Sequence, residues 1–201
     1  MFDSRLRPLI DPTLNRLGAA LARRGVTANQ LTLAGAVFGG LAGVAIALGH
    51  PLAGLALILA NRLLDGLDGA VARASRPTDF GGYLDIVCDY VFYLAVPLGF
   101  GFAAPQNLPY ALVLVATFTL TAVSFLAYAT LAAKRGVETT AHGAKSFFYS
   151  TGLAEGAETI LAFVLMCLLP SWFPLIATVF AGLCALTVIQ RSLIARRNFR
   201  A

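Results

Sequence analysis

Long apolar stretches alternate with short polar breaks along almost the whole chain. The breaks carry residues that end helices, as in Gly49-His50-Pro51 and Leu169-Pro170-Ser171. A bilayer core about 30 Å thick needs roughly 20 helical residues to cross it. Six stretches come close to this length and predict six membrane-spanning helices, at residues 30–49, 52–72, 82–102, 108–132, 147–168 and 173–194.

Composition supports this reading of the pattern. Hydrophobic residues make up 58% of the 201 positions and charged residues 12%. Soluble domains usually contain about 45–50% apolar and about 25% charged residues. Because the excess is spread over nearly the whole chain, a soluble domain with one anchor does not fit. We predict an all-α integral membrane protein.

The first 25 residues differ from the rest. They contain several arginines and no continuous apolar core, which argues against a signal peptide. Leu14, Leu17 and Leu21 fall on one helical face, which predicts an amphipathic helix in the membrane interface. We expect Asp11 to be its N-cap and Gly25 to end it.

Basic residues are distributed on one side of the predicted spans. Of the 15 Lys and Arg residues, 13 lie in the terminal segments or in the second and fourth of the five connections, and Arg191 lies in the last turn of the sixth predicted span, on the same side. This asymmetry predicts that both termini are cytoplasmic, as in a protein of the bacterial inner membrane. It also explains the net charge of +5 through orientation and attraction to anionic lipids, so we expect no nucleic-acid partner. The predicted organisation is a cytoplasmic interfacial segment at 1–25 and a six-helix transmembrane catalytic domain at 26–201.

Four aspartates break the apolar pattern: Asp65, Asp68, Asp85 and Asp89. A carboxylate inside a span costs roughly 2.5–3.5 kcal/mol on insertion scales, so four of them require a compensating partner. The members of each pair are three or four residues apart and share a helical face. Because a short hairpin joins the two helices, both pairs lie at a similar depth near the cytoplasmic side. Carboxylate oxygens converging there predict a site for Mg²⁺ or Mn²⁺.

Glycine and arginine residues are interleaved with these acids. Gly69 follows Asp68 and leaves the backbone open to a bulky ligand, and Arg73 suits the binding of a diphosphate. Close helix packing is the alternative explanation for the glycine. A topology-determining charge is the alternative for the arginine.

The acidic segment resembles the signature of the CDP-alcohol phosphatidyltransferases, which is D-x2-D-G-x2-A-R, a gap of seven or eight residues, then G-x3-D-x3-D. All eight fixed positions are present: Asp65, Asp68, Gly69, Ala72, Arg73, Gly81, Asp85 and Asp89. Upstream, the segment from Gly25 to Thr32 is similar to the family's G-x-T-P-N-x-x-T, with Ala28 in place of the proline. The close match covers the N-terminal half of the chain.

The resemblance implies a role for each of these residues. Asp65, Asp68 and Asp85 would ligate a pair of Mg²⁺ or Mn²⁺ ions, and Asp89 would join this metal site and also act as the general base. The nucleotide and diphosphate of the donor would be bound by Gly69, Ala72, Arg73 and Gly81.

The resemblance also implies the reaction. The enzyme would move a phosphatidyl or similar phosphoryl group from a CDP-linked lipid donor, such as CDP-diacylglycerol, to a small alcohol or alcohol phosphate. CMP would be released, and the product would belong to phospholipid biosynthesis. A homodimer is expected from the resemblance alone.

The acceptor is less well defined by the sequence. Lys145 is a candidate ligand for an acceptor phosphate, or a charge at the membrane edge. Glu155 and Glu158, three residues apart in the fifth predicted span, share a helical face in this interpretation. They would contact an acceptor or form a structural pair, and the sequence leaves phosphorylated and free alcohols equally open.

A cation or proton transporter is the alternative function, because transporters also place carboxylates inside the membrane. That class predicts acids near the bilayer midplane, interrupted helices or inverted repeats. The sequence shows none of these. A transporter also gives no reason for glycine and arginine at fixed offsets from the aspartates.

Overall fold

The computed structural model describes residues 3–135 and 155–199, and these ranges contain helices and no strand. The helices are α1 (Asp3–Arg23), α2 (Ala28–Ala47), α3 (Pro51–Ala74), α4 (Asp79–Ala103), α5 (Leu108–Lys134), α6 (Gly156–Leu168) and α7 (Phe173–Asn198). Single-turn 3₁₀ helices, Pro105–Asn107 (η1) and Pro170–Trp172 (η2), precede α5 and α7. The prediction of an all-α protein is confirmed.

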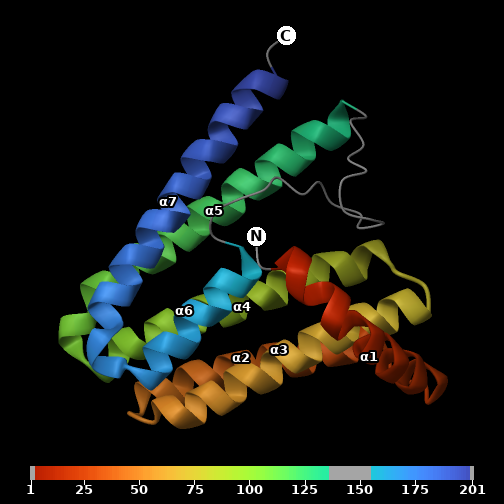
Figure 1. Cartoon of the computed structure of the whole chain (residues 1–201), viewed down its shortest axis with the longest axis horizontal. Helices are drawn as coiled ribbons and strands as arrows, with labels where there is room; N and C mark the ends of the chain where they lie inside the picture. The colour runs from red at the N-terminus through yellow and green to blue at the C-terminus, as the bar shows by residue number, and fades with distance from the viewer. Residues whose placement is uncertain (1–2, 136–154, 200–201) are drawn as a thin grey trace.

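The helices form two groups that converge at one end (Figure 1). In the first group α2 packs against both α3 and α4, and α1 lies across α3. In the second group α5 packs against α7. The contact between α4 and α5 joins the groups, and α6 contacts both α3 and α7. The turns α2–α3, α4–α5 and α6–α7 lie at the converging end, and the α3–α4 turn lies at the other.

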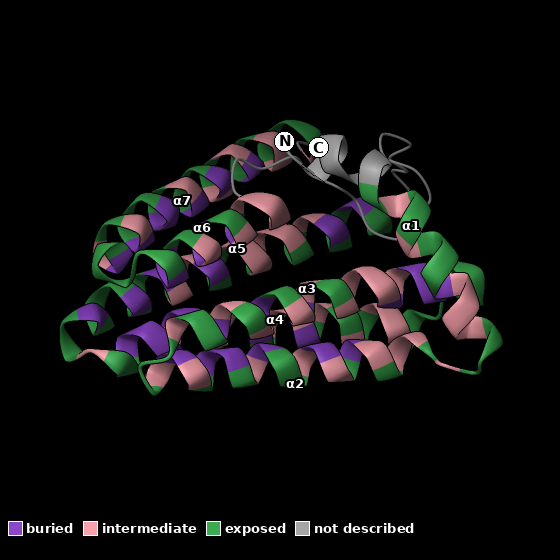
Figure 2. Cartoon of the chain, turned by 60° about the horizontal axis from the view of Figure 1, so that its bottom comes forward, coloured by how far each residue is buried: buried purple, intermediate pink, exposed green. Residues whose placement is uncertain are grey.

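Aromatic side chains fill the space between the two groups. Phe92 of α4, Phe118 of α5 and Phe163 of α6 are buried, and their rings meet edge to face at centroid distances of 5.4 and 6.0 Å. Near the converging end, Phe100 stacks on Phe173 with the centroids 4.7 Å apart. Figure 2 shows the buried residues on the helix faces that turn toward one another. This apolar core fixes how α4 is placed, and α4 carries half of the predicted acidic site.

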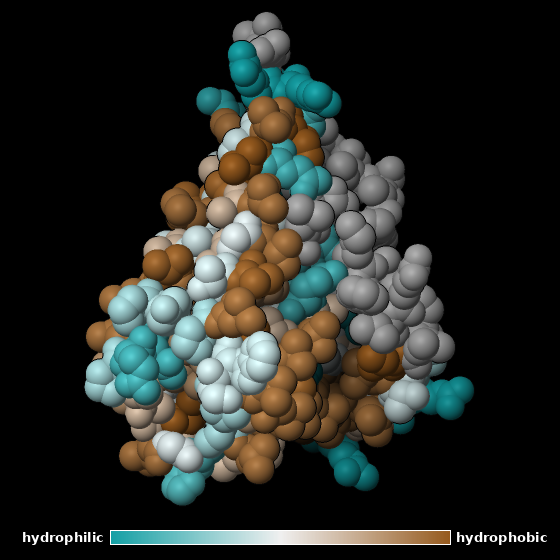
Figure 3. All heavy atoms as spheres, turned by 60° about the vertical axis from the view of Figure 1, so that its left-hand side comes forward, coloured by the Kyte–Doolittle hydropathy of each residue, from teal (hydrophilic) through white to brown (hydrophobic). Residues whose placement is uncertain are grey.

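The outward faces of the helices are also apolar (Figure 3). Exposed large hydrophobic residues run along α2 and α7, among them Leu33, Val37, Leu41, Val44, Leu175, Val179, Leu186 and Ile189. Soluble monomers rarely expose continuous apolar surface on this scale. The protein is therefore a membrane protein whose apolar helices face lipid.

Four helices of the described residues are long and apolar enough to cross a membrane: Ala28–Ala47, Asp79–Ala103, Pro105–Lys134 and Pro170–Asn198. The helix at the second predicted span, α3, is 24 residues long but carries Arg62 at its middle and Asp65, Asp68 and Arg73 in its second half. The fifth predicted span, 147–168, is represented by the 13 residues of α6, because residues 147–154 lie outside the described part. Helix positions agree with the predicted ranges to within about four residues elsewhere.

The N-terminal helix is longer than predicted. Gly25 follows its end with φ +82°, the left-handed conformation that glycine adopts freely, so the predicted stop is confirmed. The prediction that Asp11 is the N-cap is wrong, because α1 already begins at Asp3. Proline has no backbone amide hydrogen to donate, but α1 continues on both sides of Pro12.

The backbones of α2 and α4 approach closely at glycines. A Cβ atom built on Gly43 would lie 2.5 Å from the carbonyl oxygen of Ala95. A Cβ atom on Gly99 would overlap the backbone of Gly43 in the same way. Small residues at such crossings let membrane helices pack through van der Waals contact. This crossing therefore sets the spacing between α2 and the acidic face of α4.

We expect Gly43→Ala to destabilise the protein, because overpacking a tight contact costs about 1–3 kcal/mol. The apparent unfolding temperature of the detergent-purified protein should fall by several degrees. Gly40→Ala is the matched control, since a Cβ atom there meets nothing within 4 Å. Equal unfolding temperatures for the two variants would contradict the close crossing of α2 and α4.

Candidate active site

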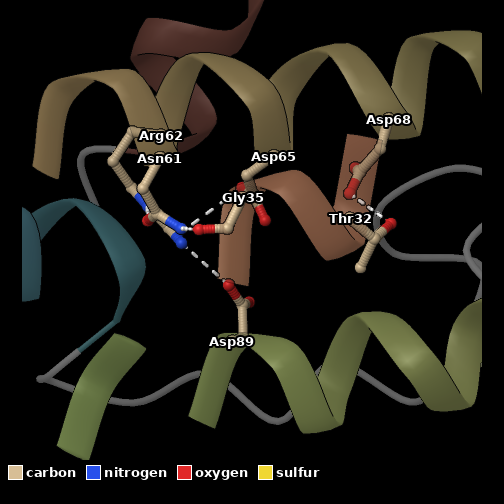
Figure 4. A network of polar contacts seen from close by, with 7 residues as sticks. All are labelled: Thr32, Gly35, Asn61, Arg62, Asp65, Asp68 and Asp89. Atoms are coloured by element: carbon tan, nitrogen blue, oxygen red, sulfur yellow. Dashed lines mark hydrogen bonds and ion pairs between the residues drawn. The ribbon is translucent and has the colours of Figure 1, made fainter. Parts of the chain in front are cut away.

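A polar recess lies between α2, α3 and α4 (Figure 4). Its lining comes from all three helices: Thr32, Gly35 and Ala36 from α2, Asn61, Arg62, Asp65 and Asp68 from α3, and Asp85, Cys88 and Asp89 from α4. The recess measures about 10 Å³, which is room for roughly one water-sized group. All four aspartates singled out in the sequence meet here.

Three of the aspartates form a tight group. Asp65, Asp68 and Asp85 each offer one carboxylate oxygen, and these three oxygens lie within 4.8 Å of one another. Two ligands on opposite sides of one Mg²⁺ ion are about 4 Å apart, because each bond is about 2.0–2.1 Å long. The oxygens therefore stand close to the separation that a shared ion requires. An all-oxygen set of this kind fits Mg²⁺ or Mn²⁺.

The three aspartates differ in how far their side chains are buried. Asp68 is buried, with 6% of its surface exposed, whereas Asp85 is exposed. The Thr32 hydroxyl of α2 donates a hydrogen bond of 2.6 Å to Asp68 Oδ2. The same hydroxyl is 3.1 Å from the Ala28 carbonyl oxygen. Thr32 thus holds the innermost carboxylate in a defined orientation, and the first turn of α2 becomes part of the site.

The start of α2 is itself fixed by a capping box. The Gln30 amide donates to the Thr27 hydroxyl at 3.3 Å, and the Thr27 amide donates to the Gln30 side-chain oxygen at 3.0 Å. These bonds satisfy amide groups that a helix start leaves without partners. They hold the turn that carries Thr32.

Asp89 lines the recess but lies outside the group of three. Its Oδ1 accepts a hydrogen bond of 2.9 Å from Arg62 Nη2, which crosses from α3 to α4. Arg62 also lies near Asp65 of its own helix, and the Nη1 to Asp65 Oδ2 distance of 3.6 Å is the longer of the two. Asp89 thus lines the same recess as the other three aspartates and also forms an ion pair with Arg62.

Arg73 lies at the other end of the acidic face. It is exposed, and its Nη2 and Nε atoms donate to Asn15 Oδ1 of α1 at 2.9 and 3.2 Å. A Cβ atom on Gly69 would be 3.3 Å from Arg73 Nη1. The absence of a side chain at Gly69 therefore leaves space for the Arg73 guanidinium. Gly66 is covered by Leu14 of α1, whose Cδ1 would be 2.9 Å from an added Cβ atom. Helix α1 therefore supports the motif helix directly.

The remaining motif positions flank the start of α4. The Gly81 amide donates to the Thr78 hydroxyl, which caps the helix, at 3.0 Å. An added Cβ atom on Gly81 would lie 3.2 Å from Asn29 Oδ1. Ala72 is half-buried on α3. The segment from Gly25 to Thr32 and the second part of the aspartate signature therefore lie next to each other at Asn29 and Gly81.

A second, larger cavity of about 130 Å³ lies between α4, α5, α6 and α7. Its lining residues are mostly aromatic and hydroxyl-bearing: Tyr90, Tyr93, Phe118, Thr121, Glu155, Gly156, Thr159 and Cys184. Arg191 of α7 donates to the Thr121 carbonyl at 2.8 Å and to the Ser124 hydroxyl at 2.7 Å, which ties α7 to the α5 wall.

The two predicted acceptor glutamates both lie at the start of α6. Glu155 is its N-cap residue, with extended backbone angles, and Glu158 is in its first turn, so the predicted fifth helix contains Glu158 but begins just after Glu155. Gly156, a poor residue for a helix interior, is the first residue of α6. Glu155 lines the cavity and Glu158 is not among its lining residues. Lys145 lies outside the described residues.

Three contacts of the site were not predicted from the sequence: Thr32 with Asp68, Asn15 with Arg73, and Asn61 with Arg62. The upstream resemblance motif contains Thr32 and was a usable signal for the first. The pattern of α1 gave no reason to select Asn15.

The sequence model of the family described as CDP-alcohol phosphatidyltransferase matches residues 25–190. The chain belongs to this family. It is therefore a membrane transferase of phospholipid biosynthesis, and the predicted resemblance is confirmed. Membership favours the transferase over the alternative of a transporter.

Among curated proteins, the inner membrane protein YnjF of Escherichia coli (strain K12) is 49% identical over 192 residues, covering 95% of this chain and 93% of YnjF. The archaetidylinositol phosphate synthase of Pyrococcus horikoshii is 38% identical over 87 residues, which cover 43% of this chain and 46% of that protein. This second relative is thus matched over less than half of its length.

Two solved structures of phosphatidylinositol phosphate synthase (PgsA1) from Mycobacterium tuberculosis have the same fold. The structure with CDP-DAG bound has a TM-score of 0.71 at 19% identity, and the match covers 91% of this chain and 93% of that one. The structure in complex with manganese and citrate has a TM-score of 0.71 at 21% identity, with 90% and 87% covered. At these identities the likeness establishes the fold.

Proposed function

We propose that this protein transfers the phosphatidyl group of CDP-diacylglycerol to an alcohol and releases CMP. The observation that carries this proposal is the group of Asp65, Asp68 and Asp85 oxygens within 4.8 Å, built from the family motif on α3 and α4. The PgsA1 structures with CDP-DAG and with manganese support it by analogy of fold.

Asp65, Asp68 and Asp85 would hold two Mg²⁺ or Mn²⁺ ions, with Asp89 beside them. Bound divalent cations would neutralise the donor diphosphate and the charge that develops on the leaving CMP. Arg73, which is exposed and oriented by Asn15, would bind a diphosphate oxygen. The space that Gly69 leaves at this guanidinium would admit the nucleotide. Ala72 and Gly81 would complete this nucleotide surface.

Asp89 would act as the general base. Its carboxylate would take the proton of the acceptor hydroxyl while the hydroxyl oxygen forms a bond to the phosphorus that bears the lipid. The bond from that phosphorus to the CMP oxygen breaks, and CMP leaves with the electron pair. Asp89 is suited to this role because it lines the recess, is only partly exposed and has its Oδ1 fixed by Arg62.

The acceptor would bind in the cavity of about 130 Å³. Tyr90 and Tyr93, which line it, follow Asp89 by one and four residues, so the cavity begins within one helical turn of the base. Hydroxyl groups and the Glu155 carboxylate offer hydrogen bonds to a small alcohol. Glu158, outside the lining, would have a structural role, and Lys145 would serve an acceptor phosphate if the alcohol carries one.

The membrane arrangement belongs to the same proposal. Six crossings, with α3 and α6 added to the four apolar helices, place the acidic end of α3 and the α3–α4 turn on the cytoplasmic side. The arginines in both terminal segments would keep both termini there, in the inner membrane of a bacterium. Segment 1–25 would lie in the interface, residues 26–201 would form the catalytic domain, and two copies would associate as a homodimer.

The direct test is CMP release by the purified protein from CDP-diacylglycerol. We expect release that requires Mg²⁺ or Mn²⁺ and one alcohol from a panel of glycerol 3-phosphate, inositol phosphate, inositol, serine, ethanolamine and choline. Asp89→Asn should lower turnover by a factor of roughly 10² or more, because general-base catalysis contributes about 10²–10⁴-fold. Asp79→Asn, at an exposed acid of the same helix, is the control. No CMP from any CDP-linked donor would refute the proposed reaction, and full turnover of Asp89→Asn would refute the assignment of the base.

The acceptor cavity makes a separate prediction. Glu155→Gln should raise the KM for the active alcohol by roughly fivefold, because one hydrogen bond to a charged group contributes about 1.5–3 kcal/mol and a neutral amide retains part of it. The KM for the CDP-linked donor should stay unchanged. Glu158→Gln makes the same chemical change beside the cavity and should leave both KM values near wild type. A larger effect on the donor than on the alcohol would show that the cavity does not bind the acceptor.

A further inference from the structure

Helix α1 lies outside the part of the chain that matches the family model, which begins at residue 25. It nevertheless packs on α3, the helix that carries the first part of the aspartate signature (Figure 1). The family motif therefore does not explain what α1 contributes to the site.

Two close contacts fix α1 against α3. A Cβ atom built on Gly18 would lie 2.6 Å from the Cβ atom of Ala70, and one built on Gly66 would lie 2.9 Å from Leu14 Cδ1. Leu14 and Gly18 are four residues apart on α1, so they share a helical face. Gly66 and Ala70 share a face of α3 for the same reason. The two helices thus meet along a narrow stripe of small residues and one leucine.

A polar contact continues this stripe toward the end of α3. Asn15 precedes Gly18 by three residues and Arg73 follows Ala70 by three, so both lie beside the packed faces. Arg73 Nη2 and Nε donate to Asn15 Oδ1 at 2.9 and 3.2 Å. Because the backbones are in close contact at Gly18 and Ala70, packing sets the position of Asn15 relative to Arg73.

The contact with Asn15 uses one side of the Arg73 guanidinium. A guanidinium has five N–H donors, and Asn15 accepts from Nε and Nη2. The donors that remain on Nη1 and Nη2 point from the end of the side chain, and such a pair can bind two oxygens of one phosphate. Nη1 lies beside Gly69, which directly follows Asp68 of the possible cation site.

An amide is well suited to hold this arginine. Its oxygen accepts hydrogen bonds without a negative charge, so Arg73 keeps its full positive charge for an anion. A carboxylate in the same place would accept the same bonds and cancel that charge. Both Asn15 and Arg73 are exposed, so a ligand can reach the guanidinium.

We propose that Asn15 is a positioning residue that turns the end of the Arg73 guanidinium toward the diphosphate of the donor. Helix α1 is then a working part of the donor site as well as a segment at the membrane surface. This inference rests on the proposed function, because it takes the ligand of Arg73 to be a CDP-linked lipid.

The test is calorimetry of CDP binding to the full-length protein in detergent, with saturating Mn²⁺. Asn15→Ala should weaken CDP binding by roughly three- to tenfold, and most of this loss should vanish in the Arg73→Ala background, because residues in contact couple. Wild-type affinity in Asn15→Ala, or an equal loss in both backgrounds, would overturn the proposal.

Asn15→Asp separates positioning from packing. Aspartate has nearly the same size and still accepts from Arg73, so a purely structural contact would survive this change. In the proposal the new carboxylate repels the diphosphate and competes for Arg73, so CDP binding should fall by roughly tenfold or more, below that of Asn15→Ala. Binding by Asn15→Asp at the wild-type level would contradict the role of Asn15.

Turnover supplies a further readout. Both variants should raise the KM for the CDP-linked donor and leave the KM for the alcohol and the Mn²⁺ affinity near wild type, because the carboxylates of the recess are unchanged. Weaker Mn²⁺ binding in Asn15→Ala would indicate a general structural role instead. Thr13→Ala is the matched control, since Thr13 is exposed on α1 and residues two apart do not share a face. It should match wild type throughout.

The two levels of the account fail in different ways. If the wild-type protein binds no CDP and releases no CMP, the proposed function is wrong and the role of Asn15 with it. If the wild-type protein does both and Asn15→Ala equals it, the function stands and only the role of Asn15 is wrong.

Discussion

Four carboxylates converge on one recess between apolar helices, and their negative charges repel one another at this short range. Much of the surrounding structure meets this constraint. Thr32 donates to the most buried carboxylate, Arg62 neutralises Asp89, and the remaining oxygens gather where a divalent cation would balance them. The close crossing of α2 and α4 at Gly43 sets the spacing between the helices that carry Thr32 and Asp89. A site where several carboxylates gather is suited to a cation, and a cation would let a diphosphate donor approach the carboxylates.

The helices and the motif residues could be predicted from the sequence, because apolar length and helical period are local properties. The contacts across helices could not. Thr32 and Asp68 are 36 residues apart, and Arg73 and Asn15 are 58 apart. Periodicity shows which residues share a face, but it does not show how each helix is rotated against its neighbours. The start of the fifth helix was predicted too early in the chain for a local reason, since α6 begins one residue after Glu155, at Gly156. Helix α3 is long enough to span a membrane, but its charged residues leave it outside the helices that are also apolar enough.

In the proposed function, donor and acceptor chemistry are divided between the two helix groups. The first group, α1 to α4, holds every motif residue. The second cavity is walled largely by α5, α6 and α7. Among the described residues only α4 lines both sites, with Asp85 and Asp89 on the recess and Tyr90 and Tyr93 on the cavity. Under the proposed function, changes in the second group would alter which alcohol binds without changing the motif site.

The central claim is that the clustered carboxylates form a divalent-cation site. A titration of Mn²⁺ into the purified protein, followed by electron paramagnetic resonance, tests it most directly. Wild type and Asp79→Asn should bind Mn²⁺ with similar affinity, because Asp79 is an exposed acid in the first turn of α4. Asp68→Asn should bind at least roughly tenfold more weakly, because it removes an innermost ligand. Equal affinity in Asp68→Asn and wild type would contradict the claim.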